Sequence, residues 1–179
     1  MLWSNHRLIG LCLAFSMTGH LLPAVCSYYG SVYPDKVEGF EFQDPNWWRN
    51  HRMSSHYWIF YMAVFCLGYR FATSGHLAMD ISLPTLWHSL NNQALSPETI
   101  IIPLVLYAAM WFAFGGLTHI LADSFCGHVP GLTPSHRVGT RLFIVGSLKE
   151  HYYAKAFSLT VIALRYLLTY QQGTFFLGP

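Results

Sequence analysis

The fold of this chain is decided by residues 96–123, which read SPETIIIPLVLYAAMWFAFGGLTHILAD. Their apolar run is long enough to cross a membrane, which takes about 20 residues in a helix. Ser96 and Pro97 make a good helix start, with a serine cap and a proline at the first helical position. His119 and Asp123 lie at positions i and i+4 near the end of the run, so they share one helix face. Ionisable side chains at membrane depth are candidates for function, because they are costly unless paired.

The composition is that of an integral membrane protein. Of 179 residues, 53% are hydrophobic, 17% aromatic and only 10% charged, whereas a typical soluble domain has about 25% charged residues. The formal net charge is +2 without a basic run, which leaves no electrostatic footprint for nucleic-acid binding. The four cysteines form no Cys-x-x-Cys pair, which argues against a disulfide framework and a cysteine-rich zinc site. The length suits one membrane-embedded domain over residues 1–179.

We predict an all-α, polytopic membrane protein with about four transmembrane helices, near residues 7–32, 56–71, 99–123 and 152–170. The first segment is interpreted as a retained helix, although Gly19, His20 and Pro23 interrupt it. The second is short for a crossing of about 20 residues. Tyrosines and tryptophans gather near the predicted boundaries, which is typical of an interfacial aromatic belt.

The charges predict an orientation for these segments. An antiparallel arrangement places the 33–55 and 124–151 loops on one side, and both termini with the 73–98 loop on the other. The first side carries most of the lysines and arginines, and the 73–98 loop has none. The positive-inside rule therefore places the first side in the cytoplasm and the 73–98 loop on the non-cytoplasmic side.

Eight histidines and acidic residues fall at the predicted cytoplasmic face: Asp35, Glu38, His51, His56, His119, Asp123, Glu150 and His151. Neutral imidazoles and carboxylates are the ligands of zinc and other first-row divalent metals. A hydrolytic metal also needs an open position for water, whose pKa it lowers. His76 and Asp80 repeat the His-x-x-x-Asp spacing, but they fall on the opposite side.

Taken singly, these residues also have structural interpretations. His119 and Asp123 could form an imidazole–carboxylate hydrogen bond that holds a helix bundle together. Asp35 follows a proline and could be a turn residue, and Glu150 could be a first-turn charge favoured by the helix dipole. His20 lies in the middle of an apolar segment and needs a partner of either kind. The metal hypothesis therefore depends on the convergence of several residues at one face.

Several short motifs occur in a characteristic order: Gly19-His20, Pro34-Asp35 with Glu38, His51-Arg52-Met53-Ser54-Ser55-His56, Thr118-His119 through Asp123, and a late basic stretch that ends at Glu150. In this order and rough spacing the chain resembles the bacterial membrane-bound metal-dependent hydrolases. These are small inner-membrane proteins, some of which are under SOS control. The usual Pro-Asp-x-Asp-His of that family is altered here, because it reads Pro34-Asp35-Lys36-Val37-Glu38 and loses a histidine.

The resemblance implies a metal-dependent hydrolase that crosses the bacterial inner membrane several times. Its metal is expected to be zinc, with one to three ions, and manganese is the alternative. The expected ligands come from His20, Asp35, Glu38, His51, His56, His119 and Asp123. Glu38 or Glu150 is expected to act as general base, and Arg52, together with Arg141, to neutralise an anionic phosphate. A site at headgroup level favours a phospholipid or a lipid-linked phosphoester as the substrate.

Two other functions fit parts of the sequence. In a non-enzymatic subunit or assembly factor of a secretion or conjugation apparatus, the same polar groups would hold the bundle together. A small transporter or metal carrier would need polar residues throughout the depth of the bilayer. The polar residues here concentrate at one face, which counts against transport.

Overall fold

The computed structural model describes residues 1–39, 52, 55–73, 97–133 and 135–171. These residues are mostly helical, which confirms the all-α prediction. The helices are α1 (Trp3–Thr18), α2 (Leu21–Gly30), α3 (Tyr33–Glu38), α5 (Trp58–Thr73), α7 (Pro97–Ser124) and α8 (Leu148–Gln171). Strands β1 (Val129–Pro130) and β2 (Arg137–Val138) form one short antiparallel pair.

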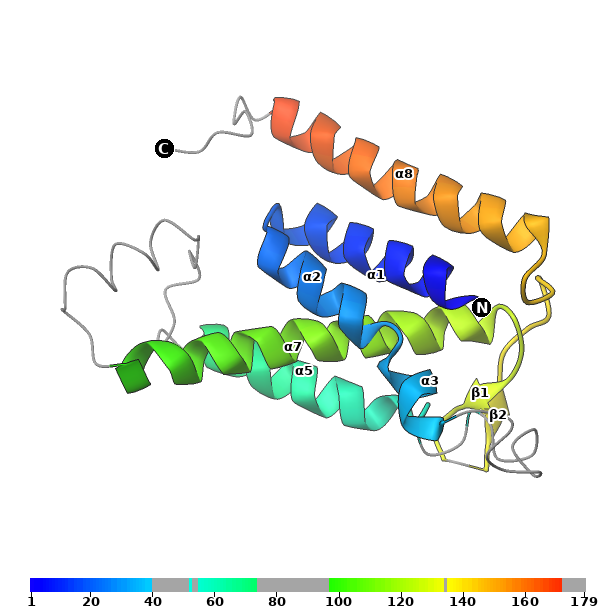
Figure 1. Ribbon diagram of the computed structural model, residues 1–179, viewed down its shortest axis with the longest axis horizontal. Coiled ribbons are helices and arrows are strands. Elements are labelled where there is room, and N and C mark those ends of the chain that lie inside the picture. Colours follow the sequence, from blue (N-terminus) through cyan, green and yellow to red (C-terminus); the bar gives the residue numbers. More distant parts are fainter. Residues whose placement is uncertain (40–51, 53–54, 74–96, 134, 172–179) are drawn as a thin grey trace.

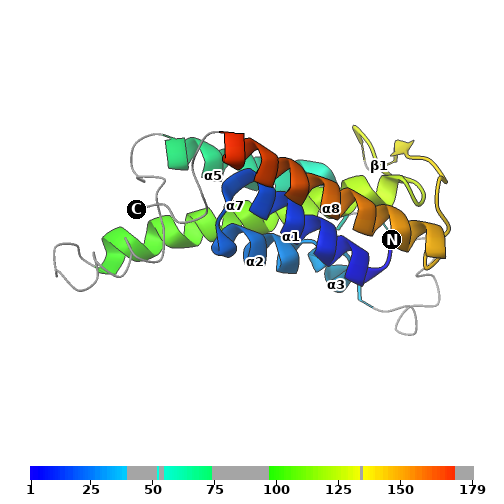
Figure 2. The same cartoon turned by 90° about the horizontal axis from the view of Figure 1, so that it is seen from above.

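Helix α7 is the axis of the bundle. Helices α1, α2 and α5 pack against it, whereas α8 packs on α1 and lies farther from α7 (Figure 1). Figures 1 and 2 both place the N-terminus, α3, the strand pair and the first turn of α8 at one end of the bundle. Because α7 ends there as well, this end collects most of the candidate residues.

The segment predicted as one span over residues 7–32 is a hairpin of two helices. Gly19 ends α1 in the left-handed conformation, with φ of 74°, and its N–H donates to the carbonyl oxygen of Phe15 at 2.7 Å. This is a common helix stop, and glycine adopts it without a steric penalty. Helices α1 and α2 have 16 and 10 residues, too few for a crossing of about 20 residues. The single-span prediction is therefore wrong, and the N-terminus lies at the end opposite to the predicted one.

The hairpin packs tightly on α7 because glycines face the contact. A Cβ atom at Gly115 would lie 2.7 Å from the amide nitrogen of Ser31, and one at Gly30 would collide with the carbonyl of Phe112. Small residues at such positions let two helix backbones approach closely. The approach brings the carbonyl oxygen of Ser31 within 2.7 Å of His119 Nδ1.

Among the described residues, one helix is long and apolar enough to cross a membrane. It is the part of α7 from Ile101 to Ser124, with a mean hydropathy of 1.8. The apolar part of α5, Trp58–Ala72, is shorter. Helices α5, α7 and α8 nevertheless occupy the segments in which the second, third and fourth apolar helices are predicted.

Candidate metal centre

Four side chains with metal-ligating atoms meet at the end of the bundle. They are Asp35 from α3, His56 from the segment before α5, and His119 and Asp123 from the last turns of α7. One ligand atom from each lies within 4.8 Å of the other three. We call these four residues the His–Asp cluster. Two imidazoles and two carboxylates are suitable donors for zinc.

Short helices and local spacing position the two carboxylates. His119 and Asp123 are one turn apart on α7, with Nε2 and Oδ2 separated by 3.8 Å. Helix α3 begins with Tyr33 and Pro34, which places Asp35 in its first turn. The indole N–H of Trp3 donates to Asp35 Oδ2 at 2.7 Å. The other oxygen, Oδ1, therefore faces the imidazoles and lies 3.4 Å from Nε2 of both histidines.

Hydrogen bonds orient both imidazoles of the His–Asp cluster so that Nδ1 has a protein partner and Nε2 faces the centre of the cluster. His119 Nδ1 lies 2.7 Å from the carbonyl oxygen of Ser31, and His56 Nδ1 lies 3.1 Å from Glu38 Oε1. Because these oxygens accept hydrogen bonds, the proton of each neutral ring belongs on Nδ1. Both Nε2 lone pairs then point into the same space, 3.0 Å apart. Such an N–H to oxygen bond behind the ring is the usual partner of a metal-bound histidine.

The separations within the His–Asp cluster are close to those between neighbouring ligands of one zinc ion. Bonds of about 2.0–2.1 Å place neighbouring ligand atoms roughly 3.3–3.4 Å apart. The two Nε2 atoms are 3.0 Å apart, and each is 3.4 Å from Asp35 Oδ1. The distances to Asp123 Oδ2 are 3.6 Å from His56 Nε2 and 3.8 Å from His119 Nε2. Among the described residues, Asp35 Oδ1 is a buried oxygen without a hydrogen-bond partner. A cation between the four atoms would satisfy it.

The electrostatics also favour a cation. Burial by itself would lower the pKa of His56, but Asp123, Asp35 and Glu38 outweigh it and raise that pKa to about 10. Burial would raise the pKa of Asp35, yet the neighbouring imidazoles of His119 and His56 hold that pKa well below its usual range. The raised pKa of His56 indicates that several carboxylates surround it, and a cation between these carboxylates would relieve their mutual repulsion.

His6 is a further site residue that the sequence analysis missed. It lies in the second turn of α1, and its ring stacks on that of His119 with a centroid distance of 3.8 Å. Its Nε2 is 3.1 Å from Asp123 Oδ1, close to the amino group of Met1, which is 2.5 Å from the same oxygen. Burial is the main cause that lowers the pKa of His6 to about 4. A neutral His6 can therefore serve as a metal ligand beside the cluster.

Two other predicted site residues support the cluster from outside. Glu38 lies behind His56 and also accepts hydrogen bonds from the hydroxyl of Ser55 and the amide of Arg52. The Arg52 guanidinium forms an ion pair with Asp123, at 2.8 Å from Nε to Oδ2. Glu38 thus orients an imidazole, and Arg52 places a positive charge at the edge of the cluster.

The remaining predicted residues lie elsewhere. His20 precedes α2 at the Gly19 turn, at the opposite end of the hairpin from the His–Asp cluster. Arg141 is exposed in the loop after β2. His51, His76 and Asp80 fall outside the described residues.

Glu150 is buried and is used to hold the N-terminal segment. Its Oε1 accepts hydrogen bonds from the amide of Leu2, at 2.7 Å, and from the side chain of Asn5, at 2.5 Å. Its Oε2 accepts the amide of Gly146 at 2.7 Å. Burial would raise the pKa of Glu150, but these donors outweigh burial and lower it. The geometry favours an anchoring role over the predicted role of general base.

We expect Glu150→Gln to lose stability and to keep most of its activity. Hydrogen bonds to a charged acceptor contribute about 1.5–3 kcal/mol each, so the free energy of unfolding at pH 7 should fall by roughly that amount. Because the folded pKa is lowered, the carboxylate's stabilisation is present above its unfolded pKa and is lost as the pH falls through the folded pKa. Thermal unfolding and zinc content of the purified variant are the measurements. A loss of activity above about 100-fold with stability and zinc unchanged would instead indicate a general base.

The comparison with known families adds an independent observation. The family model described as zinc dependent phospholipase C matches residues 27–172. The chain belongs to this family. The matched region contains the whole His–Asp cluster, whereas α1 with His6 precedes it. No curated protein and no solved structure matches the chain.

Membership of the phospholipase C family makes the protein a metal-dependent hydrolase with zinc as its metal. The enzyme and cofactor predictions are thereby confirmed. The match supports the metal-dependent hydrolase part of the resemblance, and it does so through zinc dependent phospholipases C rather than through membrane-bound hydrolases. A non-enzymatic subunit or a transporter is not what this family implies.

Proposed function

We propose that the protein hydrolyses the phosphoester bond of a phospholipid, or of a lipid-linked phosphoester, at the cytoplasmic interface of the bacterial inner membrane. The observation that carries the proposal is the His–Asp cluster, in which one ligand atom from each of four side chains lies within 4.8 Å of the other three. The family's lipid substrates supply the substrate class.

In this proposal the residues of the site have two roles, to bind the metal and to orient its ligands. Asp35, His56, His119 and Asp123 hold the metal, and Glu38 and the Ser31 carbonyl keep both Nε2 atoms turned toward it. Zinc, when bound, polarises a phosphoryl oxygen and lowers the pKa of a water molecule.

Arg52 and His6 complete the proposed site on either side of Asp123. The guanidinium of Arg52 can exchange its ion pair with Asp123 for one with the substrate phosphate, a charge-assisted contact that orients it. His6 faces Asp123 Oδ1, the oxygen turned away from His56 and His119. His6 and Asp123 would be the residues that hold a second ion, within the predicted range of one to three.

The proposed membrane arrangement has three crossing helices and one hairpin. The supporting observations are the apolar length of α7 and large apolar side chains on the outside of α5 and α8, such as Phe60 at 66% and Leu159 at 71% exposed. Exposed apolar surface of this extent is unusual for a soluble monomer. Helices α5, α7 and α8 would cross, and the α1–α2 hairpin would enter and leave on the side of the His–Asp cluster. The strand pair and the first turn of α8 lie on that side (Figures 1 and 2), and they carry Arg137 and Lys149, which favours the cytoplasm.

A phospholipid screen tests the proposed function. Zinc-loaded protein in detergent is incubated with glycerophospholipids that differ in headgroup, and release of diacylglycerol is measured. We expect turnover of at least one headgroup class by the wild type and none above background by His119→Ala. His20→Ala is the matched control, because that histidine lies at the other end of the hairpin. Failure of the zinc-loaded wild type on every headgroup, or equal rates in His119→Ala, would contradict the proposal.

A further inference from the structure

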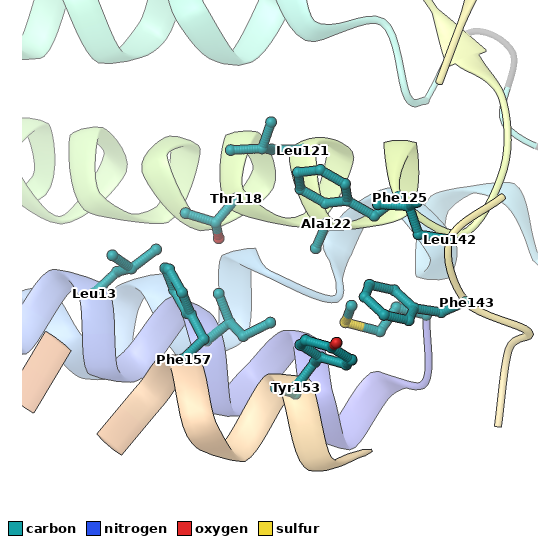
Figure 3. Close-up of a pocket in the computed structure, with 12 residues that line it drawn as sticks. Leu13, Thr118, Leu121, Ala122, Phe125, Leu142, Phe143, Tyr153 and Phe157 are labelled. Atoms are coloured by element: carbon teal, nitrogen blue, oxygen red, sulfur yellow. The ribbon is translucent and has the colours of Figure 1, made fainter. Parts of the chain in front are cut away.

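An apolar cavity of about 370 Å³ lies beside the His–Asp cluster, between α1, α7 and α8. Ala122 and Phe125 of α7 and Tyr153 and Phe157 of α8 lie around the same space, and Phe143 closes it on the loop side (Figure 3). The volume is within the range of small-molecule sites, roughly 300–1,000 Å³. The cavity opens to the surface through Leu121 and Leu142, so that a ligand can enter it.

The cavity arises from the way α8 is attached. Helix α8 packs on α1 and not closely on α7, so the width of α1 separates α7 from α8 (Figure 1). The buried side chains of Ile9, Ala122 and Ala154 form the inner wall, where the three helices meet. Small residues on α7 and α8 leave the space above that wall unfilled.

The helical geometry of α7 places the cavity next to the metal centre. Thr118 and Ala122 line the cavity, and each directly precedes a cluster residue, His119 and Asp123. Successive residues of a helix are about 100° apart around its axis. The cavity therefore occupies the neighbouring face of the same two turns of α7.

The lining is suited to a hydrocarbon chain and not to a polar group. The hydroxyl of Thr118 donates to the carbonyl oxygen of Gly115 at 2.8 Å, so that it is already satisfied within its own helix. The ring of Tyr153 packs on Phe143 with a centroid distance of 4.8 Å. Water in such a cavity would find few of the polar partners that it needs.

The mouth of the cavity opens onto apolar surface with positive charge beside it. Leu121 and Leu142 line the cavity and are each 61% exposed. The loop continues with Ile144, which is 80% exposed, between the exposed basic residues Arg141 and Lys149. An apolar rim flanked by cations is complementary to a lipid, whose chains are apolar and whose phosphate is anionic.

We propose that this cavity binds one acyl chain of the glycerophospholipid substrate while its phosphate lies at the His–Asp cluster. The proposal rests on the lipid hydrolysis proposed above, and it adds the residues that select the chain. Helix α1 contributes Leu13 to the lining, and helix α8 contributes Phe157. A chain held there would position the phosphoester and set a preference for chain length.

The test uses one variant with a larger side chain in the lining, one with a smaller side chain there, and a control outside the cavity. Leu13→Trp fills the cavity, Phe157→Ala enlarges it, and Leu159→Trp adds the same bulk as the first variant on the outside of α8. The probe is phosphatidylcholine with a photoreactive diazirine near the end of one chain, in dodecylmaltoside micelles. Cross-linked peptides are identified by mass spectrometry. We expect labelling within 118–125 and 153–157 in the wild type and in Leu159→Trp, and a drop of about tenfold or more in Leu13→Trp.

A hydrolysis assay with dihexanoyl- and dipalmitoyl-phosphatidylcholine supplies the second readout. Leu13→Trp should lose activity on the long chains and keep it on the short ones, and Phe157→Ala should shift the preference toward longer chains. Labelling confined to the outer faces of α5 and α8, or equal in Leu13→Trp and the wild type, would overturn the acyl-chain site even if hydrolysis is robust. Cavity labelling that Leu13→Trp removes, without hydrolysis of either substrate, would support the acyl-chain site and count against the proposed function.

Discussion

The double variant His119→Ala/Asp123→Ala is expected to purify without zinc and without hydrolytic activity. The two residues supply one imidazole and one carboxylate to the His–Asp cluster, and only Asp35 and His56 would remain of its four donors. Losing a hydrogen-bond partner behind a ligand typically costs about 10–100-fold in affinity or activity. Losing two ligands should cost more than the upper end of that range.

Elemental mass spectrometry of the detergent-purified protein is the measurement. The wild type should carry about one to three zinc ions per chain, depending on whether His6 and Asp123 hold a further ion. His20→Ala should carry the same number as the wild type, because His20 lies at the Gly19 turn. A double variant that retains the wild-type zinc content would contradict the assignment of the cluster.

Much of this site follows from spacing and chain direction. His119 and Asp123 share a face of any helix drawn through them, since positions i and i+4 are neighbours. Asp35 and His56 could be placed near them because they lie in a loop segment at the same end of antiparallel helices. None of these arguments needs side-chain detail, which explains why the sequence predicts all four residues of the cluster.

The missed and misplaced residues depend on tertiary structure. His6 joins the site only because the chain turns back at Gly19. The hydropathy of the same stretch predicts one interrupted apolar segment and gives no sign of the turn. The same turn moves His20 to the other end. Glu38 and Glu150 are carboxylates, which is the residue type that a general base needs. The donors that hydrogen-bond to them, such as the amide of Leu2, come from segments that only folding brings near.

Chelation of zinc is expected to lower the thermal stability of the protein substantially. Metal that binds only the folded state stabilises it by about 4 kcal/mol when free metal is 1,000 times its dissociation constant. For a chain of this size each kcal/mol shifts the melting temperature by roughly 2–4 °C. Removing zinc should therefore lower the melting temperature by about 8–16 °C. Without the ion, the buried carboxylate of Asp123 and that of Asp35 lose their shared cation.

Circular dichroism melting in detergent, before chelation, after chelation and after zinc is restored, measures this effect. Zinc should recover the wild-type melting temperature, because the Nδ1 hydrogen bonds of His56 and His119 keep their Nε2 atoms aimed at the same point. His119→Ala is the matched control and should respond little to chelator or to zinc. A wild type that melts at the same temperature with and without zinc would mean that the imidazoles and carboxylates of the His–Asp cluster stabilise one another directly. The cluster would then hold the bundle end together without a metal, and the hydrolytic zinc would have to bind elsewhere on the chain.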